Sequence, residues 1–171
     1  FGVKQNILRS FANRNCDITV FPATTKLEEI LGINPDLIFL SNGPGDPADY
    51  DAQIKVVKRL YDSNVPVLGI AFGHQLMGLA NNFKIGKLKY GHRGANQPVK
   101  DIKTGKVFIT SQNHGYKINE SSINNSLAEV IYKNGNRRVL VVADPFLAKN
   151  GYLQPLLDKM SELQLSYVVL D

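Results

Sequence analysis

Stretches with helical spacing of apolar residues alternate with short runs of consecutive apolar residues over the first half of the chain. The helical spacing, with apolar side chains three or four positions apart, predicts helices over residues 3–12, 27–31, 53–61 and 74–81. The apolar runs predict strands over residues 17–21, 37–40 and 65–70. Because strands that are apolar on both faces need cover on both faces, this alternation predicts a parallel sheet between layers of helices.

The pattern changes after residue 83. Short strands are predicted over residues 84–89, 97–101, 106–110 and 127–132, with turns at 91–94, 104–105 and 133–136. Beyond that turn, a strand at 138–143, a helix at 152–163 and a strand at 166–170 form one predicted βαβ crossover. The fold class that follows is a three-layer α/β fold with a mostly parallel sheet and a small antiparallel portion.

The composition bounds the size and class of the protein. The chain has 171 residues, 43% of them hydrophobic and 20% charged, which is typical of a globular protein and predicts one domain over residues 1–171. Cys16 is the single cysteine, which excludes an intramolecular disulfide framework, a CxxC redox motif and a thiolate zinc site. We expect Cys16 to be a small buried residue.

Charge and hydropathy narrow the possible partners. No apolar run approaches the roughly 20 residues needed to span a bilayer, and no signal-peptide pattern opens the sequence, so we expect a cytoplasmic protein without membrane contact. The net charge is +5, and its densest positive cluster lies at residues 84–93. This cluster contains no known nucleic-acid motif, which favours a solvated loop or a protein interface over nucleic-acid binding.

Two glycine-rich turns follow predicted strands. Ligands in open α/β sheets bind beyond the carboxyl ends of the strands, so both turns are candidates for a site. Residues 69–73, GIAFG, have the spacing of a nucleophile elbow, in which small residues flank a side chain on a tight strand-to-helix turn. The backbone N–H groups that follow can stabilise an oxyanion. Residues 42–45, NGPG, can bring backbone close to a small ligand, although either turn alone is also typical of simple chain reversal.

Four motifs occur together with a characteristic opening. The opening is FGVKQNI at 1–7. The four motifs are SNGPGDP at 41–47, GIAFGHQL at 69–76, GHRGANQPV at 91–99 and SQNHGY at 111–116. In this order and spacing, residues 1–132 resemble the class I glutamine amidotransferases, and among them the amidotransferase domain of carbamoyl-phosphate synthase small subunits. The resemblance implies a flavodoxin-like fold of the class I amidotransferase type.

The parent family hydrolyses glutamine to supply ammonia for carbamoyl phosphate, an intermediate of pyrimidine and arginine biosynthesis. The resemblance therefore implies glutamine as a ligand and a large synthetase subunit as a partner. It implies no cofactor and no metal.

The chemistry of that family is incomplete in this sequence. The family attacks glutamine with a cysteine on the elbow, and the motif places Ala71 at that position. A methyl group cannot attack an amide. The family also uses the histidine and glutamate of an HPE segment, whereas His74, His92 and His114 stand in other motifs. The sequence therefore predicts a catalytically inactive domain.

The resemblance implies that several ligand-binding positions remain. Gly43 and Gly45 would shape the backbone around glutamine, and the Phe72 N–H would donate to the oxyanion. The amino-acid end of the substrate would contact four further residues, which are Gln75, Asn113, Gly115 and Tyr116. Two simpler interpretations stay open: Gln75 is a helix-surface residue, and the segment from Asn113 to Gly115 is an ordinary turn.

The last segment shows a second resemblance. Residues 137–171, including the ADPFLAKNG turn, resemble the first βαβ unit of iron-dependent alcohol dehydrogenases. That family's glycine-rich phosphate loop and histidine-rich metal site do not occur in these residues, which excludes dehydrogenase activity. A chain that joins parts of two enzyme families is typical of a recombined or engineered chimera, and Ala71 also fits a substitution made to trap bound glutamine.

The two ends of the sequence suggest one further hypothesis. Residues 168–171, VVLD, followed by the opening FGVKQN would restore the strand that begins the amidotransferase domain in the family. The final strand would then fill the first-strand position in the sheet, as in a circular permutant. An open parallel sheet would otherwise expose unpaired backbone and apolar faces.

Overall fold

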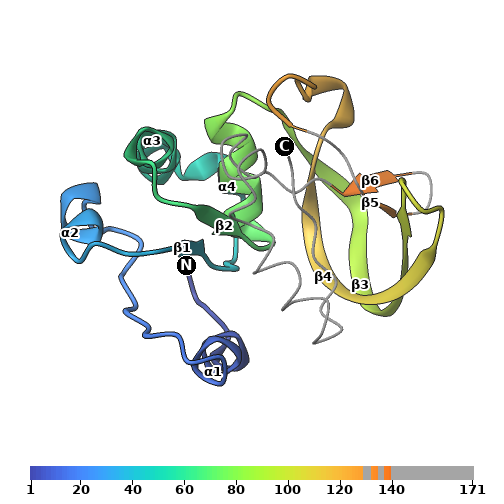
Figure 1. Ribbon diagram of the computed structural model, residues 1–171. Helices are drawn as coiled ribbons and strands as arrows, with labels where there is room; N and C mark the ends of the chain where they lie inside the picture. The colour runs from blue at the N-terminus through green and yellow to red at the C-terminus, as the bar shows by residue number, and fades with distance from the viewer. Residues whose placement is uncertain (129–131, 135–136, 140–171) are drawn as a thin grey trace. The chain divides into compact units, whose positions relative to one another are not determined.

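The contacts of the chain divide it after Ala80 into two compact units, Phe1–Ala80 and Asn81–Asp171. The computed structural model describes residues 1–128, 132–134 and 137–139 (Figure 1). Most of the predicted βαβ crossover, and the predicted final strand with its place in the sheet, lie outside the described residues. The two units are described in turn.

The first unit holds a pair of parallel strands and the helices around them. Strands β1 (Ile38–Leu40) and β2 (Val67–Gly69) pair in register, with Ile38 opposite Val67 and Leu40 opposite Gly69. The helices are α1 (Gln5–Ala12), α2 (Leu27–Gly32), α3 (Asp51–Leu60) and α4 (Phe72–Ala80), with single 3-10 turns η1 (Pro47–Asp49) and η2 (Tyr61–Ser63). These elements confirm the four predicted helices and two of the three predicted strands.

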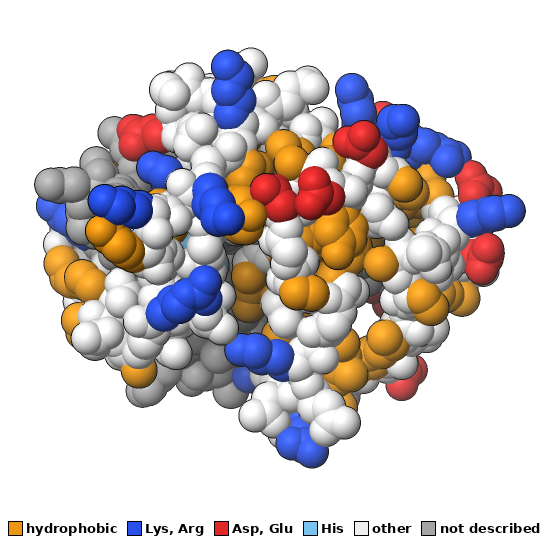
Figure 2. All heavy atoms as spheres, turned by 180° about the vertical axis from the view of Figure 1, so that it is seen from behind, with side chains coloured by type: hydrophobic (Ala, Val, Ile, Leu, Met, Phe, Trp, Pro, Cys, Tyr) orange, Lys and Arg blue, Asp and Glu red, His pale blue; other side chains and the backbone are white. Residues whose placement is uncertain are grey.

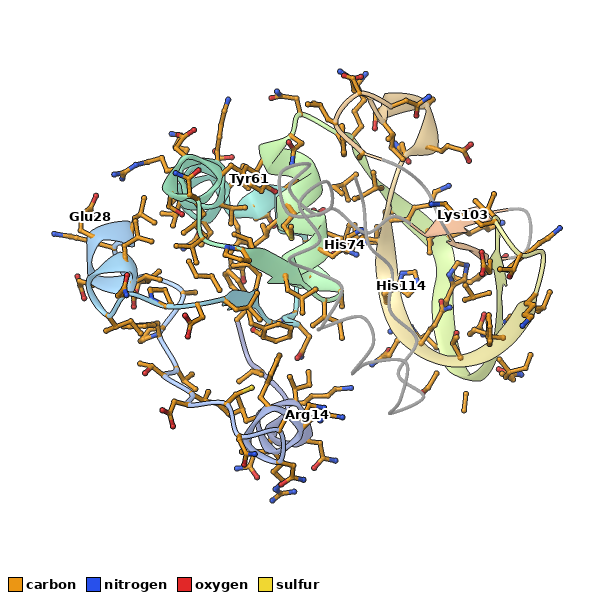
Figure 3. The ribbon with its side chains drawn as sticks, viewed as in Figure 1. Arg14, Glu28, Tyr61, His74, Lys103 and His114 are labelled. Carbon is orange, nitrogen blue, oxygen red and sulfur yellow. The ribbon has the colours of Figure 1, made fainter. Side chains whose placement is uncertain are left out.

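The core of this unit forms between α3 and α4. Leu76 and Met77 of α4 and Leu60 of α3 are each at most 1% exposed. The Tyr61 hydroxyl donates to the Met77 carbonyl at 3.4 Å, and Figure 3 shows this tyrosine beside α4. Because α4 is buried along nearly its whole length, its first turn is held firmly at the end of β2.

The predicted strand at 17–21 is wrong. These residues have no regular structure, and residues 17–20 are exposed. A run of β-branched residues becomes a strand only when a neighbour supplies hydrogen bonds and a packing surface. Cys16 is exposed as well, with its Sγ 3.9 Å from the Arg14 carbonyl, so the expectation of a buried cysteine is also wrong.

Within its described residues, the second unit contains an antiparallel sheet of four strands. Their order is β4-β3-β5-β6, and each neighbouring pair is antiparallel. The strands are β3 (Ile85–Asp101), β4 (Val107–Ile118), β5 (Tyr132–Asn134) and β6 (Arg137–Val139), and the 3-10 turn η3 (Glu120–Ser122) follows β4. Lys133 and Asn134, the first two residues of the turn predicted at 133–136, belong to β5, and residues 135–136 lie outside the described residues.

Several boundaries in this unit differ from the predictions. The two strands predicted over 84–101 are one strand, β3, which passes through the predicted turn at 91–94. Gly91 and Gly94, with φ of +73° and +127°, lie at shifts in the pairing with β4, where extra residues bulge and the strand continues. Leu127 and Ala128, at the start of the strand predicted at 127–132, lie in a turn, because their N–H groups donate to the Asn124 carbonyl. Residues 129–131 lie outside the described residues, and β5 is described from Tyr132.

Candidate functional site

The turn between β2 and α4 has the backbone of a nucleophile elbow. Ala71, at its centre, has φ of +49°. In the part of the chain that the structure describes, every other non-glycine residue with positive φ is an asparagine, a residue that tolerates this region. An alanine held here is strained, and such strain is typical of the sharp strand-to-helix turn that presents a reacting side chain. The exposed methyl of Ala71 occupies that position.

The glycines on either side of Ala71 are required by close packing. A Cβ at Gly73 would lie 2.2 Å from the Leu40 carbonyl oxygen, and one at Gly69 would lie 2.6 Å from the Met77 sulfur. The Gly73 N–H donates to the Ser41 carbonyl at 3.1 Å, and the Ile70 N–H donates to the Leu40 carbonyl at 3.1 Å. The end of β1 and the elbow are therefore joined through backbone, with no space for side chains between them.

Phe72 begins α4 directly after the elbow. The first N–H groups of a helix have no partner within the helix and lie at its positive end, so the Phe72 amide is suited to an anionic oxygen. The Phe72 ring packs between Phe1 and Tyr50, with centroid distances of 5.4 and 4.8 Å. From the sequence, Phe1 was noted only as the first residue of the FGVKQNI opening and was given no role, and Tyr50 lies outside the motifs.

Gly43 and Gly45 lie in the loop after β1. A Cβ at Gly43 would lie 2.8 Å from Phe1 backbone and 3.1 Å from the Phe72 ring, and Gly45 has φ of +89°. Asn42, which the sequence reasoning did not select, fixes the start of the chain here. Its side chain accepts from the Lys4 N–H at 3.3 Å and donates to the Gly2 carbonyl at 3.0 Å. The first unit thus brings Gly43 beside Phe72.

Gln75 is 7% exposed, although it is polar and lies one turn beyond Ala71 on α4. Its N–H donates to the Ala71 carbonyl at 3.0 Å, which continues the helix from the elbow. The interpretation of Gln75 as a helix-surface residue is wrong. A polar side chain is buried at this position because α4 is covered on nearly all sides.

The other predicted positions, Asn113, Gly115 and Tyr116, lie together on β4 of the second unit. The interpretation of the SQNHG segment as a turn is wrong, because these residues pair with β3. Asn113 lies opposite Arg93, whose Nη1 donates to the Asn113 Oδ1 at 2.5 Å. Tyr116 lies opposite Lys87, whose Nζ is 5.8 Å from the centre of the tyrosine ring. The sequence placed Arg93 only in a motif and gave it no role.

Residues 85–93 of the 84–93 cluster lie on β3, in agreement with the strand predicted at 84–89, so the cluster is not a loop. Its alternative role as a protein interface stays a prediction. Lys84, Lys87 and Lys89 are exposed, in agreement with the expected solvation. On the face that Figure 2 shows, Lys and Arg side chains are spread among polar and apolar groups and form no single basic patch. No helix within the described ranges is long and apolar enough to cross a membrane.

The sequence profile of the class I glutamine amidotransferases matches residues 1–145. The chain belongs to this family. The match reaches past residue 132, where the motif resemblance was expected to end, and includes the start of the 137–171 segment.

Curated relatives of this amidotransferase chain are carbamoyl phosphate synthase small chains. That of Pasteurella multocida (strain Pm70) is 56% identical over 123 residues, and that of Haemophilus ducreyi (strain 35000HP / ATCC 700724) is 55% identical over 123 residues. Each match covers 72% of this chain and 32% of the relative. The chain therefore spans about a third of the length of these relatives.

Solved structures confirm the predicted fold class. A glutamine amidotransferase from Thermotoga maritima superposes with a TM-score of 0.62 at 12% identity, covering 94% of this chain and 79% of that protein. A glutamine amidotransferase from Methylobacillus flagellatus superposes with a TM-score of 0.62 at 11% identity, covering 87% of this chain and 70% of that protein. The fold is the α/β, flavodoxin-like fold of class I amidotransferases, with parallel and antiparallel sheet portions.

Proposed function

We propose that this chain is a catalytically inactive amidotransferase domain of the carbamoyl phosphate synthase small-chain type. The observation that carries the proposal is the strained elbow at Ala71. The turn keeps the positive φ and the close-packed glycines that present a nucleophile, but the side chain presented is a methyl.

A second deficit supports the proposal. A thiol on the elbow would need a base to remove its proton, and an imidazole held by a carboxylate serves this purpose in the family. The three histidines of the sequence lie on α4, β3 and β4, and none is followed by Pro-Glu. His92 and His114 contact each other, with Nδ1 and Nε2 3.1 Å apart.

Substitution of Ala71 by cysteine tests the proposal. A nucleophile and its base act as a unit, so removal of either costs on the order of 10⁶-fold in rate and restoring one alone recovers little. We expect Ala71→Cys to release glutamate from glutamine no faster than the unsubstituted chain, measured by coupled glutamate detection. Cys16→Ser/Ala71→Cys is the matched control that confines any new activity to the elbow. Glutamate release at an enzyme-like rate from either form would refute the proposal.

Retained glutamine binding is the second candidate function, and the buried Gln75 favours it. This polar side chain is kept in a covered position one turn from the elbow, and a glutamine-binding pseudoenzyme would use it together with Phe72. On β4, Asn113 is fixed by Arg93. The alternative is a structural domain without a ligand, and the two are separated by the titration described in the Discussion.

The remaining expectations stay proposals. Pairing with a large synthetase subunit is supported by the names of the relatives, which are small chains of carbamoyl phosphate synthase. The dehydrogenase-like origin of 137–171, the chimera and the circular permutation depend on residues outside the described ranges. A cytoplasmic location remains an expectation from the sequence.

A further inference from the structure

The two histidines of the second unit meet across the β3–β4 hairpin. His92 and His114 are directly paired residues on neighbouring strands, and His92 Nδ1 lies 3.1 Å from His114 Nε2. Figure 3 shows the His114 side chain between β4 and β3. We propose that His92 Nδ1, His114 Nε2 and the Gln112 Oε1 bind one divalent transition-metal ion. This site is independent of the proposed function.

The spacing of the two rings fits a shared ion. Two imidazoles joined head-on by a hydrogen bond of this length would have centroids about 5.4 Å apart. The centroids are only 4.8 Å apart, with the ring planes at 82°. For a symmetric pair, these distances make the two nitrogen lone pairs converge on a point about 2.1 Å from each nitrogen, which matches zinc–imidazole bonds of about 2.0–2.1 Å.

The other nitrogen of His114 is held in the way that metal-binding histidines require. His114 Nδ1 lies 2.8 Å from the Tyr116 carbonyl oxygen, which can only accept a hydrogen bond. Nδ1 therefore carries a proton, and in the neutral ring Nε2 presents its lone pair. A histidine ligand usually donates its second N–H to a carbonyl or carboxylate in this manner.

Gln112 turns its oxygen toward the same nitrogen. Its Oε1 lies 3.0 Å from His114 Nε2, while its Nε2 donates to the Thr110 hydroxyl at 2.9 Å. The Thr110 hydroxyl in turn donates to the Gln97 carbonyl at 2.9 Å, which fixes the orientation of the glutamine amide. Two electron-pair donors therefore face each other at His114 Nε2. A divalent metal ion bound between them would accept both electron pairs.

The backbone maintains this close approach. Gly91, beside His92, has φ of +73°, and a Cβ there would lie 2.7 Å from the His114 carbonyl oxygen. The pairing of β3 with β4 shifts between Lys87 and His92, so the bulge sets which β3 residue meets His114. The hairpin is thus built so that these two imidazoles are in register.

The donor set selects the class of ion. Neutral imidazoles suit Cu²⁺, Ni²⁺ and Zn²⁺, whereas Mg²⁺ prefers oxygen ligands. Within the described residues, no cluster of three or more His, Cys, Asp or Glu side chains is placed to hold a metal, and the site proposed here has two imidazoles and an amide oxygen. The one other histidine and the one cysteine of the sequence are His74 and Cys16, and they supply the control variants.

The experiment titrates the untagged full chain with Ni²⁺, Zn²⁺ and Mg²⁺ by calorimetry. We expect one Ni²⁺ or Zn²⁺ per chain and no binding of Mg²⁺. His92→Ala and His114→Ala should each weaken Ni²⁺ binding by about tenfold or more, since each removes a ligand. Cys16→Ser and His74→Ala should leave the affinity unchanged. In the unsubstituted chain, Cu²⁺ should broaden the amide NMR signals of residues 91–93 and 112–116 before others.

Three results would overturn the proposal. One is the absence of Ni²⁺ and Zn²⁺ binding at millimolar metal concentration. Another is Ni²⁺ affinity unaffected by His92→Ala. The third is broadening of amide NMR signals by Cu²⁺ that is centred away from β3 and β4. This measurement uses the unsubstituted chain, so it does not depend on whether a variant folds.

Discussion

At the scale of the residue, Ala71 combines backbone strain with the absence of a reactive side chain. The left-handed conformation costs an alanine about 1–2 kcal/mol, and nothing in the chemistry of a methyl group offsets this cost. The strain is maintained because Gly69 and Gly73 are packed against Met77 and Leu40 and leave the turn no other path. The backbone therefore preserves an arrangement that the side chain does not use.

Ala71→Gly should stabilise the protein. Glycine adopts a φ of +49° without strain, and its greater freedom in the unfolded chain cancels only part of the gain, which leaves about 0.5–1 kcal/mol. Urea unfolding measures the difference in unfolding free energy. The matched control is Ala80→Gly in the same helix, which removes a buried methyl group and should destabilise by about 1 kcal/mol. A destabilised Ala71→Gly would show that the turn is unstrained.

At the scale of the element, the contact of β1 with the first turn of α4 decides the position of the elbow. The strand end and the helix meet through backbone, and the hydrogen bond from Gly73 to Ser41 needs that contact. In the second unit, the turn between β3 and β4 is organised by the Asp101 side chain. Its Oδ1 accepts from the Lys103 and Thr104 N–H groups at 2.9 and 3.2 Å, and its Oδ2 accepts from the Thr104 hydroxyl at 2.6 Å.

Gly73→Ala should separate β1 from α4. The added methyl would lie 2.2 Å from the Leu40 carbonyl oxygen, which cannot move without breaking the β1–β2 pairing. We expect a loss of about 3 kcal/mol in unfolding free energy, at the upper end of the cost of overpacking. Gly32→Ala is the control, because no atom lies within 4 Å of its added methyl, and it should change stability by less than about 1 kcal/mol. Equal effects of the two substitutions would contradict the assigned contact.

Asp101 should make the stability depend on pH in the acid range. The Thr104 hydroxyl and the turn N–H groups lower the pKa of Asp101 below its ordinary value of 3.8. Its contribution is therefore complete above pH 3.8 and is lost as the pH falls through the lower pKa of the folded state. Chemical denaturation from pH 2 to 7 should show that the stability difference between the unsubstituted chain and Asp101→Asn shrinks toward low pH. Asp62→Asn, at an exposed position, is the control. A constant difference would contradict the assignment.

At the scale of the whole molecule, binding of glutamine should raise the melting temperature. A ligand that binds only the native state stabilises it by about 1.4 kcal/mol at ten times its dissociation constant. If glutamine binding is retained, the melting temperature should rise with glutamine in the millimolar range and not with D-glutamine. Gln75→Ala should remove the rise. A melting temperature independent of glutamine would leave a structural domain as the function, without affecting the proposed loss of catalysis.

The sequence alone determined most of the helices and strands of the first unit, the family and the position of the elbow. The apolar periodicities identified α1 to α4, β1 and β2, and the motif spacing identified the family and the elbow, because these signals are local in the sequence. The strand predicted at residues 17–21 was wrong because a strand needs a neighbouring strand to pair with, and the apolar pattern of a segment does not show whether one is present. The proposed loss of the nucleophile follows from the identity of Ala71 in the sequence.

Tertiary structure decided what depends on residues distant in the chain. The burial of Gln75, the support of the first residues by Asn42 and the contact of Arg93 with Asn113 each join segments that no local pattern relates. The meeting of His92 with His114 depends on the register of two strands and on a bulge at Gly91, and a slip of one residue would turn the two rings to opposite faces of the sheet.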